Sequence, residues 1–258
     1  MPGYTRVMLR SAAVFALSIA PSIALLSGAQ ADDPTPDNLV RLHEAWGPRA
    51  STPGASLVIQ ESERAGTTIK YRLIADGLPK EGVYSILSWP VTQKGPSQAL
   101  GGVTLDGSGL AVCAGKPGTC GTPDKPNDPI DTVFQPIPGE PVRLGLVSAD
   151  DATRVFVKLV PIPLRGEDQG CRIEATLLTP GAELVLIEGS GLPPNSELTF
   201  ESISEGERHG GKGKADGDGR YVSAVLPHKQ GIAAGILKVN LKASRCNPSV
   251  SVPWGRRK

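Results

Sequence analysis

The chain has 258 residues, a formal net charge of +1 at pH 7, and an aromatic content of only 4%. Such a small net charge gives no electrostatic basis for binding nucleic acid or an anionic membrane. The low aromatic content argues against a carbohydrate-binding protein, which needs exposed rings for stacking.

The first 31 residues have the pattern of a cleavable export signal. Arg6 and Arg10 precede an apolar run at 11–26, and Ala29-Gln30-Ala31 is the small-x-small pattern that signal peptidase accepts. The alternative is a transmembrane anchor, but the run is short for one, and no later segment approaches about 18 continuous apolar residues. We therefore expect a signal peptide at 1–31, cleavage after Ala31, and an extracytoplasmic protein, periplasmic or secreted, with no membrane span.

One short helix is expected directly after the signal, within an N-terminal segment at 32–51. Thr35 can cap it, Pro36 suits its first position, and Leu39, Leu42 and Trp46 fall on one stripe. About ten residues are too few for a helix that is stable alone. We expect this helix to pack on the domain that follows or to form a leader arm.

The remaining residues repeat one pattern loosely. A Gly-Leu-Pro turn at 77–79 is matched by another at 191–193, and the Asp-Gly pair at 106–107 by the pair at 216–217. Each half then ends in two extended runs and a proline. The order and spacing predict a duplicated domain, with one copy at 52–164 and the other at 165–258.

Short runs rich in Val, Ile, Leu and Thr lie between turns in each copy and predict strands. Asp-Gly pairs between extended runs favour hairpin turns, because glycine adopts positive φ freely. We expect strands at 56–60, 68–74, 84–89, 102–105, 110–112, 142–147 and 155–160 in the first copy. In the second copy we expect them at 171–178, 183–188, 197–202, 220–226, 235–241 and 249–252.

Two stretches of the second half resemble a known family. Residues 189–200 read GSGLPPNSELTF and residues 215–221 read ADGDGRY. Both are similar to the turn and hairpin of exported bacterial immunoglobulin-like domains. The resemblance implies an all-β chain, with two tandem immunoglobulin-like β-sandwiches after a signal peptide and a short N-terminal helix. Because the shared motifs describe turns and strands, the resemblance implies no functional residue.

Four cysteines, Cys113, Cys120, Cys171 and Cys246, follow the export signal, and an even number in an oxidising compartment favours disulfides. Three pairings are possible. The order of the copies favours Cys113 with Cys120 and Cys171 with Cys246. In the immunoglobulin-like topology the second pair also lies where the first strand starts and the penultimate strand finishes. A zinc site is the alternative, but the paired Cys-x-x-Cys spacing is absent, so we expect no metal and no cofactor.

Two long segments without a periodic pattern are candidate contact loops, at 114–132 and 204–214. Their charged residues are the candidate contact residues: Lys116, Asp124, Lys125 and Asp128 in the first, and His209, Lys212 and Lys214 in the second.

Catalytic motifs are absent, and no catalytic residue is expected. The three histidines, His43, His209 and His228, are each interpreted as solvated surface residues, without a nucleophile or an orienting partner. The Asp-Gly pairs only superficially resemble an aspartic-protease corner at Asp106 and a calcium loop at Asp216, and both are interpreted as hairpin turns.

These observations favour a non-enzymatic exported binding, adhesion or envelope-accessory protein. Its partner would be a protein or an envelope component, and we expect a monomer. One alternative is a secreted hydrolase or metal-dependent enzyme that uses His209 or His228 with Asp216 and Asp218, which requires these side chains to converge within about 4–6 Å. Another is a small-molecule carrier that uses a cleft between the sandwiches, which a large apolar pocket would support.

Overall fold

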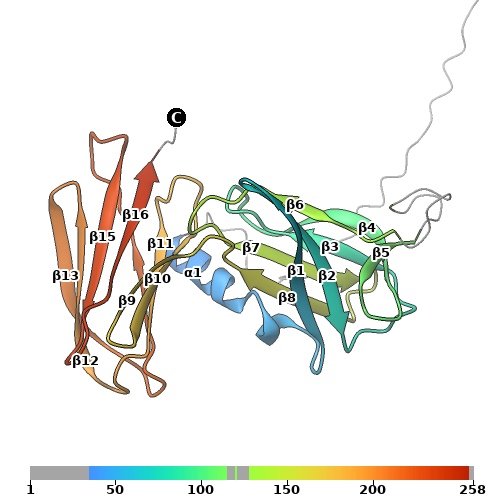
Figure 1. Ribbon diagram of the computed structural model, residues 1–258, viewed down its shortest axis with the longest axis horizontal. Coiled ribbons are helices and arrows are strands. Elements are labelled where there is room, and N and C mark those ends of the chain that lie inside the picture. Colours follow the sequence, from blue (N-terminus) through green and yellow to red (C-terminus); the bar gives the residue numbers. More distant parts are fainter. Residues whose placement is uncertain (1–34, 115–119, 121–127, 256–258) are drawn as a thin grey trace, which may run out of the picture. The chain divides into compact units, whose positions relative to one another are not determined.

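The structure is a computed structural model that describes residues 35–114, 120 and 128–255 (Figure 1). The described residues form one α-helix, α1 (Pro36–Ala45), one 3-10 helix, η1 (Pro48–Ala50), and strands that pair antiparallel throughout. The all-β prediction is confirmed. The predicted signal peptide at 1–31 and cleavage after Ala31 lie outside the described residues. No described helix is long and apolar enough to cross a membrane.

Two sheets are built from residues 56–159. One has the order β1-β2-β6, with strands β1 (Ser56–Ala65), β2 (Thr68–Asp76) and β6 (Thr132–Phe134). The other has the order β5-β4-β3-β7-β8, with strands β3 (Tyr84–Ser88), β4 (Ser97–Leu105), β5 (Ala111–Cys113), β7 (Val142–Ser148) and β8 (Arg154–Leu159). Strand β2 shows why these residues form a sheet. Ile69, Tyr71, Leu73 and Ala75 alternate along it and are buried in the core, while the residues between them face outward.

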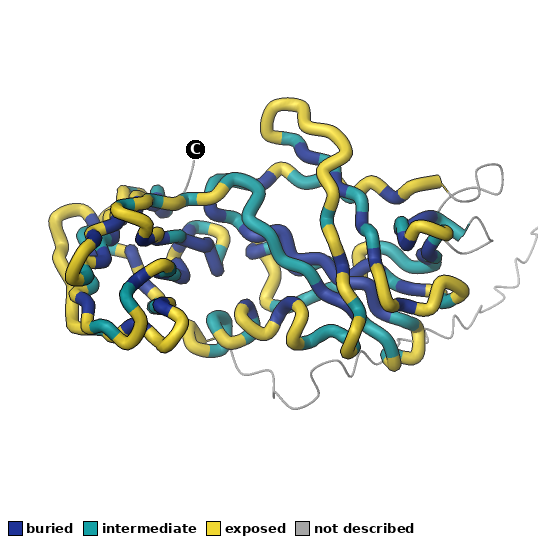
Figure 2. The backbone as a smooth tube through the Cα atoms, turned by 60° about the horizontal axis from the view of Figure 1, so that its bottom comes forward, coloured by how far each residue is buried: buried dark blue, intermediate teal, exposed yellow. Residues whose placement is uncertain are grey.

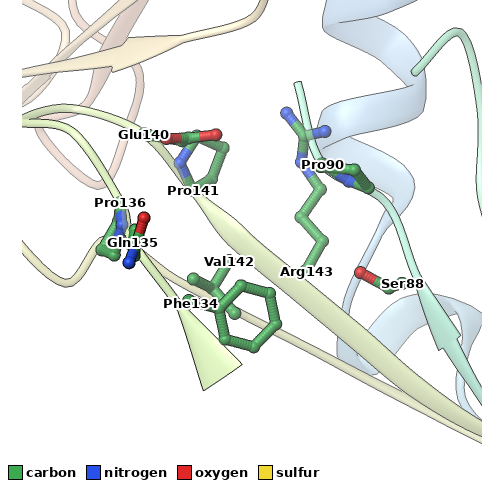
Figure 3. A pocket seen from close by; sticks show the side chains of 9 residues that line it. All are labelled: Ser88, Pro90, Phe134, Gln135, Pro136, Glu140, Pro141, Val142 and Arg143. Atoms are coloured by element: carbon green, nitrogen blue, oxygen red, sulfur yellow. The ribbon is translucent and has the colours of Figure 1, made fainter. Parts of the chain in front are cut away.

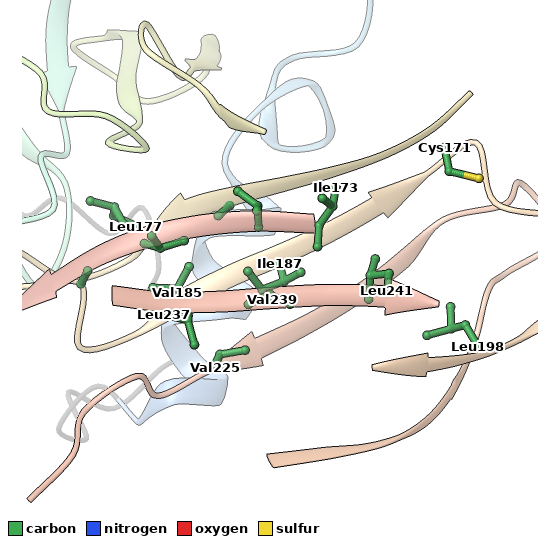
Figure 4. Packing of buried hydrophobic residues seen from close by; sticks show 14 of the residues in the cluster. Cys171, Ile173, Leu177, Val185, Ile187, Leu198, Val225, Leu237, Val239 and Leu241 are labelled. Carbon is green, nitrogen blue, oxygen red and sulfur yellow. The ribbon is translucent and has the colours of Figure 1, made fainter. Parts of the chain in front are cut away.

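Two further sheets are built from residues 164–255. One has the order β14-β11-β10-β9, with strands β9 (Leu164–Asp168), β10 (Cys171–Leu177), β11 (Val185–Ser190) and β14 (Tyr221–Val225). The other has the order β13-β12-β15-β16, with strands β12 (Glu197–Ser204), β13 (Glu207–Lys214), β15 (Ala234–Lys242) and β16 (Ser249–Gly255). A second core lies between them. Ile173 and Ile187 from one sheet and Leu237, Val239 and Leu241 from the other are nearly inaccessible to solvent (Figure 4).

All thirteen predicted strands overlap a strand of the structure, and three observed strands, β6, β9 and β13, were not predicted. The prediction of a loop at 204–214 is wrong, because a two-residue turn joins β12 to β13 there, and β13 pairs with β12 along its whole length. Most of the predicted loop at 114–132 lies outside the described residues. Its described end is partly ordered, since Ile130 is buried and β6 begins at Thr132.

Helix α1 forms as the sequence predicts. Its C-terminal end packs on the first pair of sheets, and its Leu39 and Val40 pack against Leu178, Leu184 and Leu186 of the second half. Thr35 caps it, with the hydroxyl accepting a hydrogen bond from the Asn38 N–H at 3.4 Å. Trp46 at its end is buried and donates its indole N–H to the Val157 carbonyl at 3.0 Å. The interpretation of His43 as a surface residue is wrong: this residue is only 1% exposed, because it lies on the face of α1 that covers β7 and β8.

The two repeated Asp-Gly segments form the same turn. The Asp106 carboxylate accepts from the N–H groups of Ser108 and Leu110, and the Asp216 carboxylate accepts from those of Asp218 and Arg220. The predicted hairpin turns are therefore present, and the same carboxylate oxygen in each turn is occupied by backbone donors. In Figure 2 exposed turns are yellow, and several strands have dark blue stretches that run through the buried interior.

Glycine is required at one position of this turn. Gly219 has a φ of +70°, and a Cβ placed there would overlap the Leu192 carbonyl oxygen. Replacing Gly219 with alanine should therefore lower the free energy of unfolding by about 1–2 kcal/mol, measured by urea denaturation. Gly217→Ala is the matched control, because its Cβ would have no neighbour within 4 Å and its φ is not positive. Equal losses in the two variants would contradict this account.

The cysteines form two bridges, Cys113 with Cys120 and Cys171 with Cys246. This is the pairing that the order of the two copies favours, one bridge in each half of the chain. The second bridge is the more buried, since Cys171 is 1% and Cys246 is 5% exposed. Cys171 begins β10, and Cys246 follows the end of β15, so this bridge joins the two sheets of the second half.

Candidate functional site

The candidate contact residues separate into two groups. Lys116, Asp124 and Lys125 lie outside the described residues, and Asp128 is exposed beside the first disulfide, where its carbonyl accepts from the Cys113 N–H at 3.0 Å. His209, Lys212 and Lys214 all lie on β13. The structure therefore brings the second group together on one strand rather than on a flexible loop.

Strand β13 is the edge of its sheet. It pairs with β12 on one side from Ser204↔Glu207 to Glu197↔Lys214, without a register shift, and it is the last strand in the order β13-β12-β15-β16. Seven of its eight residues are exposed, and Gly213 is intermediate. At about 3.4 Å per residue the edge is about 27 Å long.

The turn that precedes β13 determines which backbone groups face away from β12. Glu205 and Gly206 both have positive φ, +46° and +82°, which is the type I′ turn of a two-residue hairpin. The residues that flank such a turn form a hydrogen-bonded pair, and hydrogen-bonded and non-hydrogen-bonded pairs then alternate. The N–H and C=O groups of four residues therefore point to the open edge: Arg208, Gly210, Lys212 and Lys214.

The edge is basic. Three cations and one carboxylate lie within eight residues. Arg208 pairs with Glu201 of β12 at 2.8 Å, and the His209 side chain, 75% exposed, lies 4.0 Å from the Glu207 carboxylate. Lys212 and Lys214 have no ion pair within the part of the chain that the structure describes, so their charges are available to a partner.

An open hollow of about 600 Å³ lies where β13 ends. Its lining includes Lys214, Asp216, Arg220 and Tyr221. Arg220 is paired with Glu188 at 3.0 Å, and Lys214, which has no ion pair among the described residues, lies opposite Glu197 in the strand register. Lys214 is recognisable from the sequence, but the hollow is not, because residues on both sides of the turn at Asp216, together with Asn195, line it.

The other strands at sheet edges differ from β13. Strand β1 is longer, but its register shifts between Glu61 and Glu63, and such a bulge interrupts edge pairing. Strand β8 is covered, since the Thr52 N–H donates to the Arg154 carbonyl at 2.8 Å. Strand β14 is five residues long, and β5 and β6 are three each. The two remaining edge strands, β9 of five residues and β16 of seven, lie against each other. Among these edges, β13 combines length, regularity and exposure.

A second feature is a buried cation on β7. Arg143 is 2% exposed, its Nε donates to His43 Nδ1 at 3.2 Å, and its Nη1 donates to the Trp89 carbonyl at 3.3 Å. The guanidinium carbon lies 4.3 Å from the centroid of the Trp89 ring. Burial lowers the pKa of Arg143 to about 10, which leaves it protonated at neutral pH. Burial, with Lys158 and Arg143 nearby, lowers the pKa of His43 to about 2.

The pocket beside Arg143 is small. It measures about 60 Å³ and is lined by Ser88, Phe134, Gln135 and Glu140, with Arg143 and Glu140 on opposite sides (Figure 3). Ligand clefts usually measure about 300–1,000 Å³. The Glu140 carboxylate also accepts from the Ile137 N–H at 3.1 Å and disfavours an anion next to it. We interpret Arg143 and His43 as a clamp that holds α1 on the sheet rather than as a ligand site.

The residues of the enzyme alternative are not assembled. His209 lies in the middle of β13, five residues from the strand end that precedes Asp216, which is about 17 Å of extended chain. His228 contacts Trp254 of β16 at 5.9 Å between ring centroids. Asp216 uses its carboxylate within its own turn. No group of three or more His, Cys, Asp or Glu in the described ranges could hold a metal ion.

No known protein family matches this chain, and no curated protein matches it. Among the described residues, the β13 edge combines open backbone groups with a lysine, Lys212, that has no ion pair.

Proposed function

We propose that this chain is an exported, non-enzymatic binding protein built of two tandem immunoglobulin-like β-sandwiches, at 52–164 and 165–258. Its partner is a protein or an envelope component, and it acts as a monomer. The observation that carries the binding function is the open basic edge of β13, where Lys212 and Lys214 lack ion-pair partners among the described residues.

Strand order supports the tandem arrangement. The order β4-β3-β7-β8 in the first half parallels β13-β12-β15-β16 in the second, and β1-β2 parallels β10-β11. In an immunoglobulin-like sandwich of seven strands, the third, fourth, sixth and seventh strands can form one sheet. Strands β3, β4, β7 and β8 hold these places in the first half, and β12, β13, β15 and β16 hold them in the second. The repeated turns at Asp106 and Asp216 occupy equivalent positions between strands in the two halves.

Export is supported by the disulfides. Two bridges are compatible with an oxidising compartment, since such bonds are rare in the cytosol. Mass spectrometry of the protein recovered from outside the cytoplasm tests this part. We expect a chain that begins at Asp32 and has no free thiol. Recovery of the full-length chain from the cytoplasm, or a free Cys113 or Cys171, would contradict it.

Binding is tested with the solubilised envelope of the producing cell and the immobilised protein. We expect the native chain to retain at least one component, and the double variant Lys212→Glu/Lys214→Glu to lose it. Lys238→Glu is the matched control, because Lys238 is exposed on β15 of the same sheet but that strand is paired on both sides. Equal retention by the native chain and the double variant, or no retention at all, would oppose the proposal.

A further inference from the structure

We propose that β13 binds an extended acidic peptide segment, which joins the sheet as an additional strand beside it. This inference rests on the proposed binding function and names the chemistry of the partner. Each of Arg208, Gly210, Lys212 and Lys214 offers one N–H and one C=O along the open edge, as derived above from the hairpin turn. An extended chain satisfies such a row of groups with its own backbone, as in other complexes that form by strand addition.

Charge selects an acidic partner. The side chains of Arg208, Lys212 and Lys214 share the outer face of the sheet, because they lie opposite Ile203, Thr199 and Glu197 of β12, which alternate with the buried Leu198 and Ser202. Arg208 is paired with Glu201 and Lys214 lies opposite Glu197, so Lys212 is the cation of this row with no carboxylate paired with it or opposite it on β12. A strand added at the edge would place every second side chain next to these cations on that face. Asp or Glu at those positions forms favourable cross-strand pairs, whereas Lys or Arg is repelled. The same repulsion opposes the pairing of β13 with β13 of a second copy.

The glycines specify the other face of the partner. Gly211 lies opposite Phe200 of β12 on the inner face, and a Cβ placed on Gly211 would meet no atom within 4 Å. Phe200 is only partly buried. An apolar or aromatic side chain of the added strand can therefore pass over Gly211 and contact the Phe200 ring, as aromatic residues do beside edge glycines. The expected ligand alternates acidic residues with apolar ones.

The hollow beyond Lys214 extends the same site. It begins where the edge ends, and Lys214 lines it. An added strand that runs past Lys214 would enter this hollow, which the Asp216 carboxylate also lines. Tyr221 fills the inner face at this end, since a Cβ on Gly213 would overlap its ring, so apolar residues of the ligand are required only beside Gly211.

The test uses the full mature chain and synthetic peptides of nine residues with capped ends. One peptide alternates Glu with Val and carries a central Tyr, the second has Lys in place of Glu, and the third is the acidic peptide with N-methyl groups on alternate amides. Isothermal titration calorimetry gives the affinity, and amide hydrogen exchange locates the site. We expect the acidic peptide alone to bind, and to slow exchange at the amides of Arg208, Gly210, Lys212 and Lys214.

Variants separate the backbone from the charge contribution. Lys212→Pro removes one outward N–H and one cation, and proline is tolerated where the N–H of an edge strand faces solvent. We expect it to weaken binding about tenfold or more, and Lys212→Ala about two- to fivefold. Lys238→Glu should bind like the native chain. Thermal unfolding checks that each variant folds, and the N-methylated peptide keeps the backbone test independent of any variant.

The possible results decide between distinct conclusions. Equal binding of the acidic and basic peptides, or undiminished binding of the N-methylated peptide, would overturn the inference. Concentration-dependent dimerisation that is lost in the Lys212→Pro variant would assign the edge to a second copy and overturn it too. Retention of an envelope component without binding of any peptide would overturn this inference and leave the proposed function intact. If the chain retained no envelope component and bound no peptide, the proposed function would be overturned as well.

Discussion

Replacing Cys171 and Cys246 with alanine is expected to lower the free energy of unfolding by up to about 4.5 kcal/mol. The two cysteines are 75 residues apart, so the bridge closes a long loop and strongly restricts the unfolded chain. In the folded chain it ties the start of β10 to the segment after β15 within the core. Urea denaturation of the oxidised protein, monitored by circular dichroism, measures the loss.

The bridge between Cys113 and Cys120 provides the matched comparison. Its separation is only 7 residues, for which the same chain-entropy relation gives about 2.5 kcal/mol at most. Both of its cysteines are only partly buried, so their replacement with alanine removes less core packing. An equal or larger loss for this pair would show that restriction of the unfolded chain is not the main contribution of the longer bridge.

The sequence predicts the strands of this fold where burial alternates. In β2 and β15 every second residue is apolar and lies in a core, so the pattern that marks the strand is also the interaction that stabilises it. The same holds for the turns. Asp-Gly pairs signal them, and the Asp106 and Asp216 carboxylates stabilise them by accepting backbone hydrogen bonds. For these strands and turns, the residues of the segment itself are sufficient to predict the structure.

Sequence reasoning fails at β13 because that strand has no buried face. Three glycines and a row of charged residues carry no alternating pattern, and strand formation there depends on pairing with β12. The Glu205-Gly206 pair was the available signal, since a turn of two residues with positive φ joins β12 to β13. His209, Lys212 and Lys214 were thus correctly grouped on one segment, but their strand geometry was missed.

His43 could not be placed from the sequence for a different reason. A single histidine on a short amphipathic helix is usually solvated, and nothing local distinguishes the buried case. What buries it is distant in the chain, because Arg143 and Lys158 lie about a hundred residues away. The contact between α1 and the sheet could therefore not be predicted, because Arg143 and Lys158 are far from His43 in the sequence.

This clamp predicts an acid-sensitive fold. His43 has its pKa lowered from 6.5 to about 2, first by burial and then by Lys158 and Arg143. Its contribution to stability is fully present above pH 6.5. Below that pH the unfolded chain takes up a proton that the folded chain excludes, so stability falls by up to about 1.4 kcal/mol per pH unit. Between pH 7 and pH 4.5 we expect a loss of about 2.5 kcal/mol, measured by urea denaturation across this range.

The variant His43→Asn separates the contribution of His43 to the acid sensitivity from that of other groups. Asparagine does not titrate, and its side-chain oxygen can accept the hydrogen bond that Arg143 Nε donates to His43 Nδ1. The variant should therefore lose less stability than the native chain over the same pH range, and the difference between the two curves is the contribution of His43. His228→Asn, which changes an exposed histidine, should follow the native curve. An unchanged slope in His43→Asn would show that the imidazole becomes protonated without being expelled from the contact between α1 and β7.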